Sequence, residues 1–509
     1  MPVQPFSRFF PSHNLISQYR IAIPDITILE MLIELQEGLT NKGSRNRLKV
    51  RTYRKRMGMT ERKVSREERR FQPAQLLAAS FVGAILIGTL LLALPFSTQS
   101  GKISFVDSLF TATSAVCVTG LTVRDTATYF SPVGQVILLI LFQLGGLGIM
   151  AFSTLILLVA GKRISVKDRI VIQEGYASSK IKNVKVLLRN IFVYALIIEL
   201  IGTLFLYIHW CSRFSGPQTF FESVFHSVSA FCNAGFSLSS NSFIACRGDM
   251  WLNIILMVLI VLGGLGFLVL QELIGMSVAL IKRKKIHVSL HTKLVLTLTF
   301  FLVVVSALSI FFIEGNRAMQ DFGMKEKILA SFFQAVTART AGFHTMALNS
   351  LSFASIFMLV ILMFIGASPG STGGGVKTST AGVIFAFLKS RVQARESVSL
   401  FYRTLPLDQV IKAFAVVTLS IGVIFLATFA LFLVQQEGPM EGVFFEVVSA
   451  FGTVGLSLGI TPELTGLGKA ILVLTMYVGR IGPLTLLYAF SRRRAYGKFE
   501  YVEGSVMIG

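Results

Sequence analysis

Long apolar stretches recur along the chain from about residue 76 to residue 490, and they fall into pairs. The first members of the pairs cover about 76–95, 188–210, 293–313 and 411–434, and the second members cover about 133–160, 251–281, 352–388 and 467–490. A helix needs about 20 apolar residues to cross the hydrocarbon core of a bilayer. The pattern therefore predicts an all-α, polytopic membrane protein with eight transmembrane helices.

Each pair brackets a shorter, semi-polar stretch that ends at a glycine and cannot span a bilayer. The four stretches, which end one residue after Gly120, Gly235, Gly342 and Gly455, read LFTATSAVCVTGL, VFHSVSAFCNAGF, SFFQAVTARTAGF and FFEVVSAFGTVGL. A phenylalanine stands ten residues before each glycine, at Phe110, Phe225, Phe332 and Phe445. Six residues before the glycines stand Ser114, Ser229, Val336 and Ser449. This self-similarity predicts four helix–pore-loop–helix repeats in a pseudo-four-fold arrangement around one pore.

The repeated stretch suits a short helix that enters the membrane and returns as a loop. Irregular backbone is tolerated at that depth only where it lines an aqueous path. The C-terminal ends of four such helices attract a cation, and loop carbonyls can replace the hydration shell of a potassium ion. Glycine reaches the left-handed backbone that stacked carbonyls need. Four glycines in register behind four phenylalanines therefore favour a cation filter over helix caps or packing sites.

The repeats also predict how the chain is divided. The predicted segments are a basic N-terminal extension (1–72), repeat 1 (73–161), repeat 2 with its preceding connection (162–282), repeat 3 (283–389) and repeat 4 with the C-terminal tail (390–509). Residues 40–72 are basic and poor in apolar side chains. We expect the extension to be disordered or to lie on anionic lipid at the cytoplasmic face.

Composition supports the membrane interpretation, and charge adds an orientation. Hydrophobic residues make up 53% of the chain and charged residues 15%, and the mean hydropathy is +0.69. The net charge of +22 invites a nucleic-acid function, but 15 of the 48 Lys and Arg precede residue 76 and 22 lie in alternate connections and the tail. This asymmetry follows the positive-inside rule. It predicts a plasma-membrane protein with both termini in the cytoplasm and argues against nucleic acid as a partner.

The runs TSAVCVTGL, SAFCNAGFSL, TARTAGFHT and FGTVGLSLGIT resemble the filter segments of the Ktr/Trk/HKT superfamily of potassium transporters. The resemblance covers residues 73–509 and is greatest to the Ktr-type membrane subunit. It implies that K⁺ is bound by the residues leading to each glycine. On this sequence these are Cys117, Val118, Thr119, Gly120, Cys232, Asn233, Ala234, Gly235, Arg339, Thr340, Ala341, Gly342, Gly452, Thr453, Val454 and Gly455. Serine in place of the first glycine accompanies sodium selectivity in the superfamily, so Gly120 favours potassium.

The second apolar stretch of repeat 3 contains the run IGASPGSTGGGVKTSTAG, which begins at Ile365. Its glycines and its proline predict a helix break near mid-membrane, which is typical of a transport path. The run is similar to a phosphate-binding loop, but Val376 interrupts that motif and no soluble strand precedes it. The resemblance implies an intramembrane gate made of Gly370, Ser371, Thr372, Gly373, Gly374, Gly375, Lys377 and Arg480.

Two gate residues keep a second interpretation. Lys377 can instead extend its amine to the membrane surface. Arg480, within an apolar stretch, is a functional candidate because intramembrane charges are costly. A buried structural pairing of Arg480 with a carboxylate is the alternative.

Together these features predict potassium uptake across the cell membrane through a four-loop filter with an intramembrane gate. K⁺ is the transported ion, no organic cofactor is expected, and a dependence on Na⁺ is left open. The alternatives are a sodium-conducting member of the superfamily, a secondary cation transporter of another class, and a membrane scaffold subunit. An enzyme is disfavoured, because no H-E-x-x-H motif occurs and the six histidines do not cluster.

The resemblance also implies partners that the residues alone do not reveal. It implies a homodimer in which each protomer has its own pore and the tail KFEYVEGSVMIG lies at the interface. It implies a separate cytoplasmic ring that binds nucleotides, in addition to contact with membrane lipids.

Overall fold

The computed structural model describes residues 73–149, 184–211, 216–283, 288–435 and 439–490. The predicted N-terminal extension (1–72) and the C-terminal tail (498–509) lie outside the described residues. The described chain is helical apart from one small hairpin, in which β1 (Ser399–Leu400) pairs antiparallel with β2 (Arg403–Thr404).

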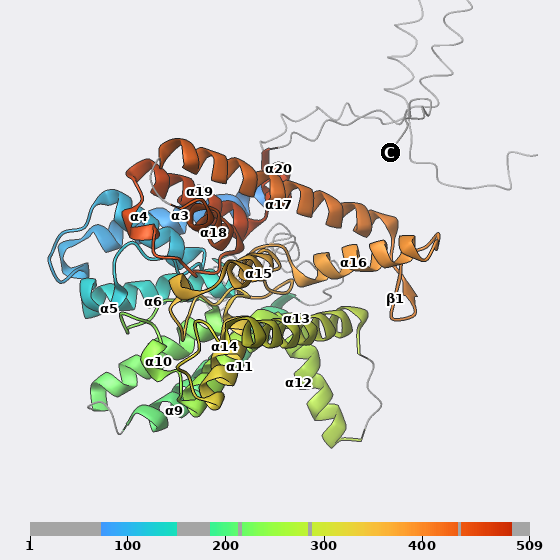
Figure 1. The fold of residues 1–509 in the computed structure, drawn as a ribbon, viewed down its shortest axis with the longest axis horizontal. Helices are drawn as coiled ribbons and strands as arrows, with labels where there is room; N and C mark the ends of the chain where they lie inside the picture. Colours follow the sequence, from blue (N-terminus) through green and yellow to red (C-terminus); the bar gives the residue numbers. More distant parts are fainter. Residues whose placement is uncertain (1–72, 150–183, 212–215, 284–287, 436–438, 491–509) are drawn as a thin grey trace, which may run out of the picture. The chain divides into compact units, whose positions relative to one another are not determined.

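The helices form four successive groups along the chain (Figure 1). The first group contains α3 (Pro73–Ala93), α4 (Phe105–Val116), α5 (Thr126–Tyr129) and α6 (Pro132–Leu147). The second contains α9 (Val184–Trp210), α10 (Gly216–Cys232), α11 (Met250–Leu265) and α12 (Phe267–Ile281). The third contains α13 (Leu290–Glu314), α14 (Met324–Thr337), α15 (Phe353–Phe364) and α16 (Thr378–Val392). The fourth contains α17 (Leu407–Val434), α18 (Met440–Gly452), α19 (Gly466–Ile481) and α20 (Pro483–Phe490).

One helix in each group is long and apolar enough to cross a membrane. These spans are Ala74–Ala93, Leu188–Trp210, Leu290–Glu314 and Leu407–Val434. Among the described residues, the bent pairs α11 with α12 and α19 with α20 also qualify if each pair is one span. The long helices expose large apolar side chains, as with Leu90 (65%), Phe312 (77%) and Phe425 (72%). Such a surface is suited to lipid rather than to water. The chain is therefore a multi-pass membrane protein.

The second helix of each group is short, and its C-terminal half is buried. These helices are α4, α10, α14 and α18, and each packs against the long helix that precedes it. Their shared anchor is a phenylalanine with no exposed surface, which is Phe110, Phe225, Phe333 or Phe445. In the third group the buried ring belongs to Phe333, so the alignment that assigned this place to Phe332 was wrong by one residue.

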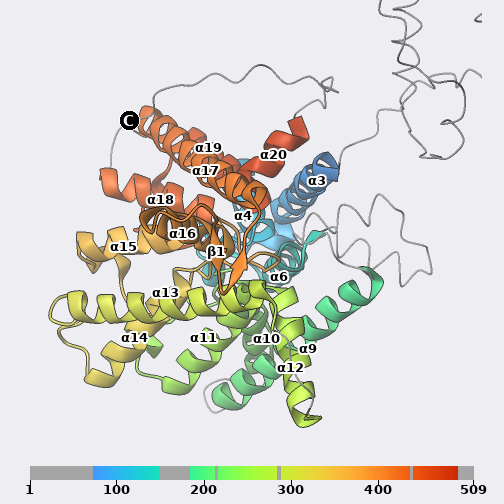
Figure 2. The ribbon, with the colours of Figure 1, turned by 90° about the vertical axis from the view of Figure 1, so that its right-hand side faces the viewer.

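Contacts between the groups run in a closed cycle. The helix after each filter stretch packs against the short helix of the next group: α6 on α10, α11 on α14 and α15 on α18. The cycle closes because α19 of the last group packs on α4 of the first. Figure 1 shows the ends of α12 and α16 extending away from the packed helices, and Figure 2 shows the same helices turned by 90°.

Within the described residues, the predicted second spans of the second, third and fourth groups are interrupted, whereas the sequence predicted a break in the third alone. The helix α6 ends before Gly148 (φ +87°), α11 ends at Gly266 (φ +92°), and α19 ends at Gly482 (φ +92°). The chain bends by 108° between α11 and α12 and by 91° between α19 and α20. A left-handed glycine ends each helix because it reaches this backbone conformation without a Cβ penalty.

Close packing explains the glycines inside these helices. Three residues before each break lies a further glycine, which is Gly145, Gly263 or Gly479. A Cβ atom added there would overlap a backbone carbonyl oxygen in the last turn of the short helix of the same group. The inner helices therefore touch the short helices backbone to backbone, and this contact brings their breaks directly beneath the filter segments.

Candidate cation pathway

Each short helix ends within a few residues of its glycine, and the chain then folds back on the last turn. The backbone N–H of the residue before the glycine donates to a carbonyl of the helix in every group. The four bonds are Thr119 to Ser114 (2.7 Å), Ala234 to Ser229 (2.8 Å), Ala341 to Thr337 (2.9 Å) and Val454 to Ser449 (2.9 Å). The third bond spans four residues and the others span five, so the third segment is one residue shorter.

Hydroxyl groups at the ends of the short helices tie down the backbone around the glycines. Ser114 and Ser449 accept hydrogen bonds from the N–H groups of Gly120 (3.0 Å) and Gly455 (3.1 Å). Ser229 Oγ and Thr337 Oγ1 donate to the carbonyl oxygens of Phe236 (2.8 Å) and Phe343 (2.6 Å). Thr337 therefore takes the place that the sequence alignment gave to Val336, and the apparent exception in the third repeat disappears.

Two residues of every filter segment have a left-handed backbone. The glycines have φ values of +90°, +73°, +80° and +89° in chain order. Two residues earlier, Val118, Asn233, Thr340 and Thr453 have φ values of +58°, +58°, +81° and +50°. This conformation is strained for the β-branched valine and threonines. Strain of this kind persists where the surrounding structure imposes it, which is typical of functional sites.

The four glycines form a closed ring. A Cβ atom added at Gly120 would lie 2.6 Å from the carbonyl oxygen of Ala234 and 2.9 Å from Cα of Gly235. A Cβ atom added at Gly235 would lie 3.0 Å from Ala341 O, and one added at Gly342 would lie 2.6 Å from Val454 O. One added at Gly455 would lie 3.0 Å from Cα of Gly120, which closes the ring. Four segments from four distant regions of the chain thus approach one another through backbone atoms alone. Such a ring offers carbonyl oxygens to a dehydrated cation and has no room for a side chain.

Side chains of the segments link neighbouring groups or turn outward. The side-chain amide of Asn233 lies 3.2 Å from Thr340 Oγ1, which joins the second and third segments. Arg339 is buried, and its Nη2 donates to Thr299 Oγ1 of α13 (3.4 Å). The guanidinium of Arg339 is therefore directed to the long helix of its own group, and only its backbone belongs to the segment.

The loop between α15 and α16 lies against the filter segments and against the breaks of the neighbouring helices. Gly374 N–H donates to Thr453 Oγ1 (2.8 Å), and a Cβ atom at Gly373 would lie 2.9 Å from Cβ of Thr340. The loop also donates from Ser368 and Thr372 to the carbonyls of Gly264 (3.0 Å) and Gly263 (3.3 Å). The structure thus brings the predicted gate residues together directly below the third and fourth segments.

Arg480 joins this loop to the first group. It occupies the position in α19 that Gly146 and Gly264 hold in α6 and α11. Its guanidinium donates to the carbonyl oxygens of Thr372, in the loop, and Gly145, in α6. A positive charge at this position would oppose the passage of a cation along a path through the glycine ring.

Lys377 ends the loop, and its amine does not extend to the surface. Its Nζ donates to the carbonyl oxygen of Gly373 (2.6 Å) and approaches that of Gly374 (3.5 Å). The amine thereby stabilises the backbone of Gly373 and Gly374, which contact the filter segments. The interpretation of Lys377 as a surface-seeking side chain is wrong for this structure.

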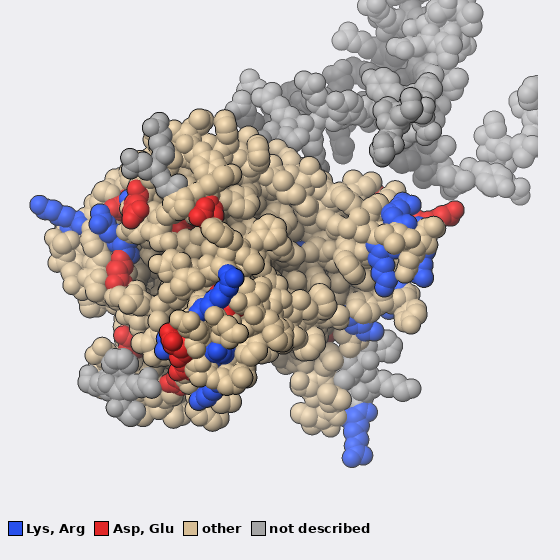
Figure 3. Space-filling view, viewed as in Figure 1, with Lys and Arg blue, Asp and Glu red and all other residues tan. Residues whose placement is uncertain are grey.

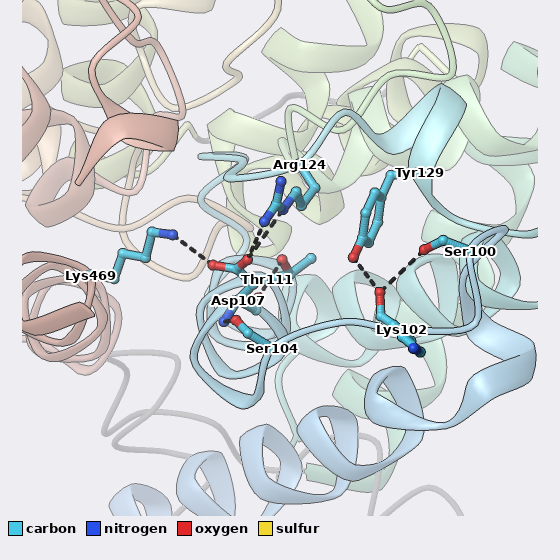
Figure 4. A network of polar contacts seen from close by, with 8 residues as sticks. All are labelled: Ser100, Lys102, Ser104, Asp107, Thr111, Arg124, Tyr129 and Lys469. Carbon is cyan, nitrogen blue, oxygen red and sulfur yellow. Dashed lines mark hydrogen bonds and ion pairs between the residues drawn. The ribbon is translucent and has the colours of Figure 1, made fainter. Parts of the chain in front are cut away.

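An ionic cluster lies on the opposite side of the filter, at the start of α4 (Figure 4). Asp107 is buried, and its two oxygens accept from Lys469 Nζ (2.7 Å) and from Arg124 Nη2 (3.1 Å) and Nε (3.2 Å). Arg124 follows the first filter segment, whereas Lys469 belongs to α19. The cluster joins the first group to the last at the contact that closes the cycle.

Sequence reasoning missed several functional candidates. The breaks at Gly148, Gly266 and Gly482 had a signal in the repeated glycine pairs three residues apart. Buried carboxylates were also missed, among them Asp107 and Glu446. Their signal was an acidic residue within a short, semi-polar helix that the repeat predicts to be buried.

Comparison with known proteins finds a matching family and similar relatives. A family model described as "TrkH: Cation transport protein" matches residues 54–500. "Ktr system potassium uptake protein B" of Bacillus subtilis is 40% identical over 442 residues, which cover 86% of this chain and 97% of that protein. "Potassium/sodium uptake protein NtpJ" of Enterococcus hirae is 36% identical over 451 residues, or 87% of this chain and 99% of that protein.

A solved structure has the same fold. The potassium transporter TrkH from Vibrio parahaemolyticus superposes with a TM-score of 0.66 at 19% sequence identity, over 84% of this chain and 87% of that chain. At this identity the likeness concerns the fold alone.

Proposed function

Because this chain belongs to the TrkH family of cation transport proteins, we propose that it carries potassium across the cell membrane through the ring of four glycine segments. Eight membrane-crossing passes in four helix–pore-loop–helix repeats surround this path. The observation that carries the proposal is the closed ring made by Gly120, Gly235, Gly342 and Gly455. The relatives named as potassium uptake proteins match this chain over nearly their whole length.

In this proposal the K⁺-binding atoms are backbone carbonyl oxygens. They belong to the residues that lead to each glycine, from Cys117, Cys232, Arg339 and Gly452 onward. Carbonyl rings replace the hydration shell of potassium, and the C-terminal ends of four short helices add negative potential. The filter therefore attracts a cation without any charged side chain at the ion.

The gate consists of the loop from Gly370 to Gly375 together with Lys377 and Arg480. Its contacts with Thr453 and with the carbonyl of Gly145 support a closed state, because they hold glycine backbone and a guanidinium across the path. Opening requires that the loop and Arg480 move aside together. The chain is proposed to be a transporter of an ion and no enzyme.

The charge distribution supports an orientation. Figure 3 shows basic side chains gathered where α16 and the β1–β2 hairpin extend from the packed centre. Lys389, Arg391, Arg395 and Arg403 lie in this region. The positive-inside rule places it, and both termini, in the cytoplasm. We infer that this face meets the separate nucleotide-binding ring and that two protomers, each with its own pore, form the membrane unit.

Sodium transport is the second candidate, because one relative is named as a potassium/sodium uptake protein. The resemblance to the superfamily implies that Gly120 favours potassium, since serine at this position accompanies sodium selectivity there. A contribution of Na⁺ to uptake is compatible with this filter. The uptake experiment described next tests it by comparing K⁺ uptake with and without Na⁺.

The test uses cells that lack their own potassium uptake systems and express this chain with a Ktr-type regulatory ring. We compare the wild type, Gly235→Ser and the control Gly275→Ala, whose added Cβ meets nothing within 4 Å. The wild type and the control should take up K⁺. Gly235→Ser should raise the KM for K⁺ by about tenfold or more, because about 1.4 kcal/mol lost at the filter has that effect.

Uptake at each K⁺ concentration is measured with and without Na⁺, and membrane insertion is checked by surface labelling. If a properly inserted wild type carries no K⁺, the proposed function fails. If Gly235→Ser is inserted and transports like the wild type, the filter assignment fails and a secondary transporter with a different ion site becomes the better description.

A further inference from the structure

A buried carboxylate stands behind the fourth filter segment. Glu446 lies in α18, nine residues before Gly455, and has no exposed surface. Its Oε1 accepts from Ser457 Oγ, and its Oε2 accepts from Thr461 Oγ1 (2.8 Å). The backbone N–H of Leu458 also donates to this carboxylate.

These partners form the loop that immediately follows the fourth glycine. Ser457 is two residues after Gly455, and its Oγ in turn accepts from the N–H of Gly459 (2.9 Å). One carboxylate thereby holds the loop at residues 457, 458 and 461. Because the loop continues the filter strand, its position also determines where the carbonyl oxygens near Gly455 lie.

The second segment repeats this arrangement with a histidine. His226 lies nine residues before Gly235 and is buried. The N–H of Leu238 donates to His226 Nε2 (3.2 Å), and Ser237 Oγ lies 3.2 Å from the same nitrogen. Ser237 Oγ accepts from the N–H of Ser239 (3.0 Å), as Ser457 does from Gly459. Since Nε2 is an acceptor, the ring proton is on Nδ1, where it reaches the carbonyl oxygen of Glu222 (2.9 Å).

The remaining segments lack this support among the residues that the structure describes. Thr111 donates to the carbonyl of Asp107 on its own helix (2.8 Å). Gln334 is fully buried, and neither of its amide atoms has a hydrogen-bond partner among the described residues. In the glycine ring, Gly235 and Gly455 each adjoin both Gly120 and Gly342. The two supported segments therefore face each other across the path.

We propose that Glu446 and His226 are positioning residues that determine ion selectivity: each holds the loop after its glycine, through Ser457 and Ser237, so that two opposite segments keep the spacing required by K⁺. The proposal rests on the proposed function of the ring. The difference between K⁺ and Na⁺ in a carbonyl site depends on the positions and number of the oxygens. Loosening two opposite loops should therefore weaken K⁺ binding more than Na⁺ binding.

The test measures equilibrium ion binding to the purified full chain. This measurement reports on the filter without requiring transport through the gate or the presence of a partner. Calorimetric titration with KCl and with NaCl, in a buffer of a large organic cation, gives both dissociation constants. The variants are Ser457→Ala, Ser237→Ala, Glu446→Ala, Glu446→Gln and the double variant Glu446→Ala/Ser457→Ala. Glu441→Gln, on the exposed side of the same helix, is the matched control.

Ser457→Ala and Ser237→Ala should each weaken K⁺ binding by about fivefold, and Glu446→Ala by about tenfold, which corresponds to about 1–1.4 kcal/mol. The ratio of K⁺ to Na⁺ affinity should fall by a similar factor. Glu446→Gln should recover some of the loss, because one carbonyl oxygen remains. The double variant should resemble Glu446→Ala, since both changes break the same contact. Glu441→Gln should bind both ions as the wild type does.

The two serine variants keep the test decisive if Glu446→Ala does not fold. If the wild type prefers K⁺ and folded Ser457→Ala, Ser237→Ala and Glu446→Gln all retain that preference within twofold, this inference is overturned while the filter stands. If the wild type itself does not prefer K⁺ to Na⁺, the proposed filter fails, and this inference fails with it.

Discussion

At the scale of single residues, backbone conformation and fixed charge distinguish the proposed ion path from ordinary helix packing. Val118, Thr340 and Thr453 are β-branched residues held at positive φ, at a cost of about 1–3 kcal/mol each. Arg480 replaces a glycine of the equivalent helices and binds two carbonyl oxygens from two other groups. The first feature shapes the backbone around the glycine ring, and the second supplies the charge of the proposed gate.

Replacing Arg480 with alanine should increase ion leakage. Two unit charges about 8 Å apart at an effective dielectric constant near 20 repel by about 2 kcal/mol, so removal of the guanidinium should raise Rb⁺ flux by about tenfold or more. The measurement is ⁸⁶Rb⁺ entry into proteoliposomes that contain this chain alone. Arg480→Lys retains the charge and should show a much smaller rise. A correctly inserted Arg480→Ala that leaks no more than the wild type would contradict the gate.

Replacing Asp107 with asparagine should destabilise the protein by about 1–3 kcal/mol, because charged hydrogen bonds from Lys469 and Arg124 are lost. Burial raises the pKa of Asp107, but the hydrogen bond and charge of Lys469, followed by those of Arg124, outweigh it and bring the pKa below its ordinary value of 3.8. A lowered pKa in the folded state stabilises the protein above the unfolded pKa, and this stabilisation is lost as the pH falls through the folded pKa.

Thermal unfolding in detergent checks this pH dependence. The difference in melting temperature between the wild type and Asp107→Asn should be large at neutral pH and should shrink below about pH 4. Asp321→Asn, at an exposed carboxylate, is the control and should have little effect. A difference that does not change with pH would mean that the charge of Asp107 contributes nothing to stability.

At the scale of elements, each group combines a long lipid-facing helix, a short buried helix and an interrupted helix. In the first, second and fourth groups the helix end follows from a glycine pair: one glycine admits the carbonyl of the short helix, and the next, three residues later, ends the helix at positive φ. After Gly266, Phe267 N–H donates to Gly370 O (2.9 Å) in the gate loop. The helix break of the second group thus binds the gate loop of the third group.

Gly266→Ala should destabilise the protein by about 1–3 kcal/mol. The residue has φ +92°, and an added Cβ would lie 2.6 Å from the carbonyl oxygen of Pro369, so the change strains the backbone and displaces the loop. Gly275→Ala, inside α12 and in open space, should instead stabilise the helix by up to about 1 kcal/mol. Melting temperatures of the two variants should move in opposite directions. Equal shifts would contradict the role assigned to Gly266.

At the scale of the whole molecule, the four groups meet through a closed cycle of contacts. The cycle closes where α19 packs on α4, and Asp107 and Lys469 hold that contact by an ion pair of 2.7 Å. At the filter, backbone from all four groups converges in one ring. An ion bound there touches every group and should stabilise their association.

Potassium should therefore raise the melting temperature of the purified chain. A ligand at 100 times its Kd stabilises the state that binds it by about 2.7 kcal/mol. The melting temperature should be higher in KCl than in an equal concentration of a large organic cation chloride, with NaCl intermediate or without effect. Gly235→Ser should lose most of the K⁺ effect. A shift that is the same for all cations would indicate ionic strength rather than a filter.

The family resemblance read from the four glycine segments is confirmed by the match over residues 54–500, and the helical, multi-pass fold was predictable as well. The length of an apolar stretch and the spacing of its glycines can be read from the local sequence. The thickness of the bilayer determines which stretches are long enough to span it as helices, and shorter ones must return as loops. The break between α15 and α16 was predictable for the same reason, since glycine and proline act on their own segment.

The sequence by itself determined the kind of elements, the family and the four glycines; the tertiary structure decided which atoms meet. The carbonyl partners of Arg480 lie in two other groups. Lys377 and the shortened turn at Thr337 are held by hydrogen bonds within their own group, but packing decides which of these bonds form. Asp107 binds Lys469 of another group, whereas Glu446 binds Ser457 and Thr461 of its own group. Such contacts join residues up to several hundred positions apart, and the direction of a side chain is decided by packing, which no local pattern records.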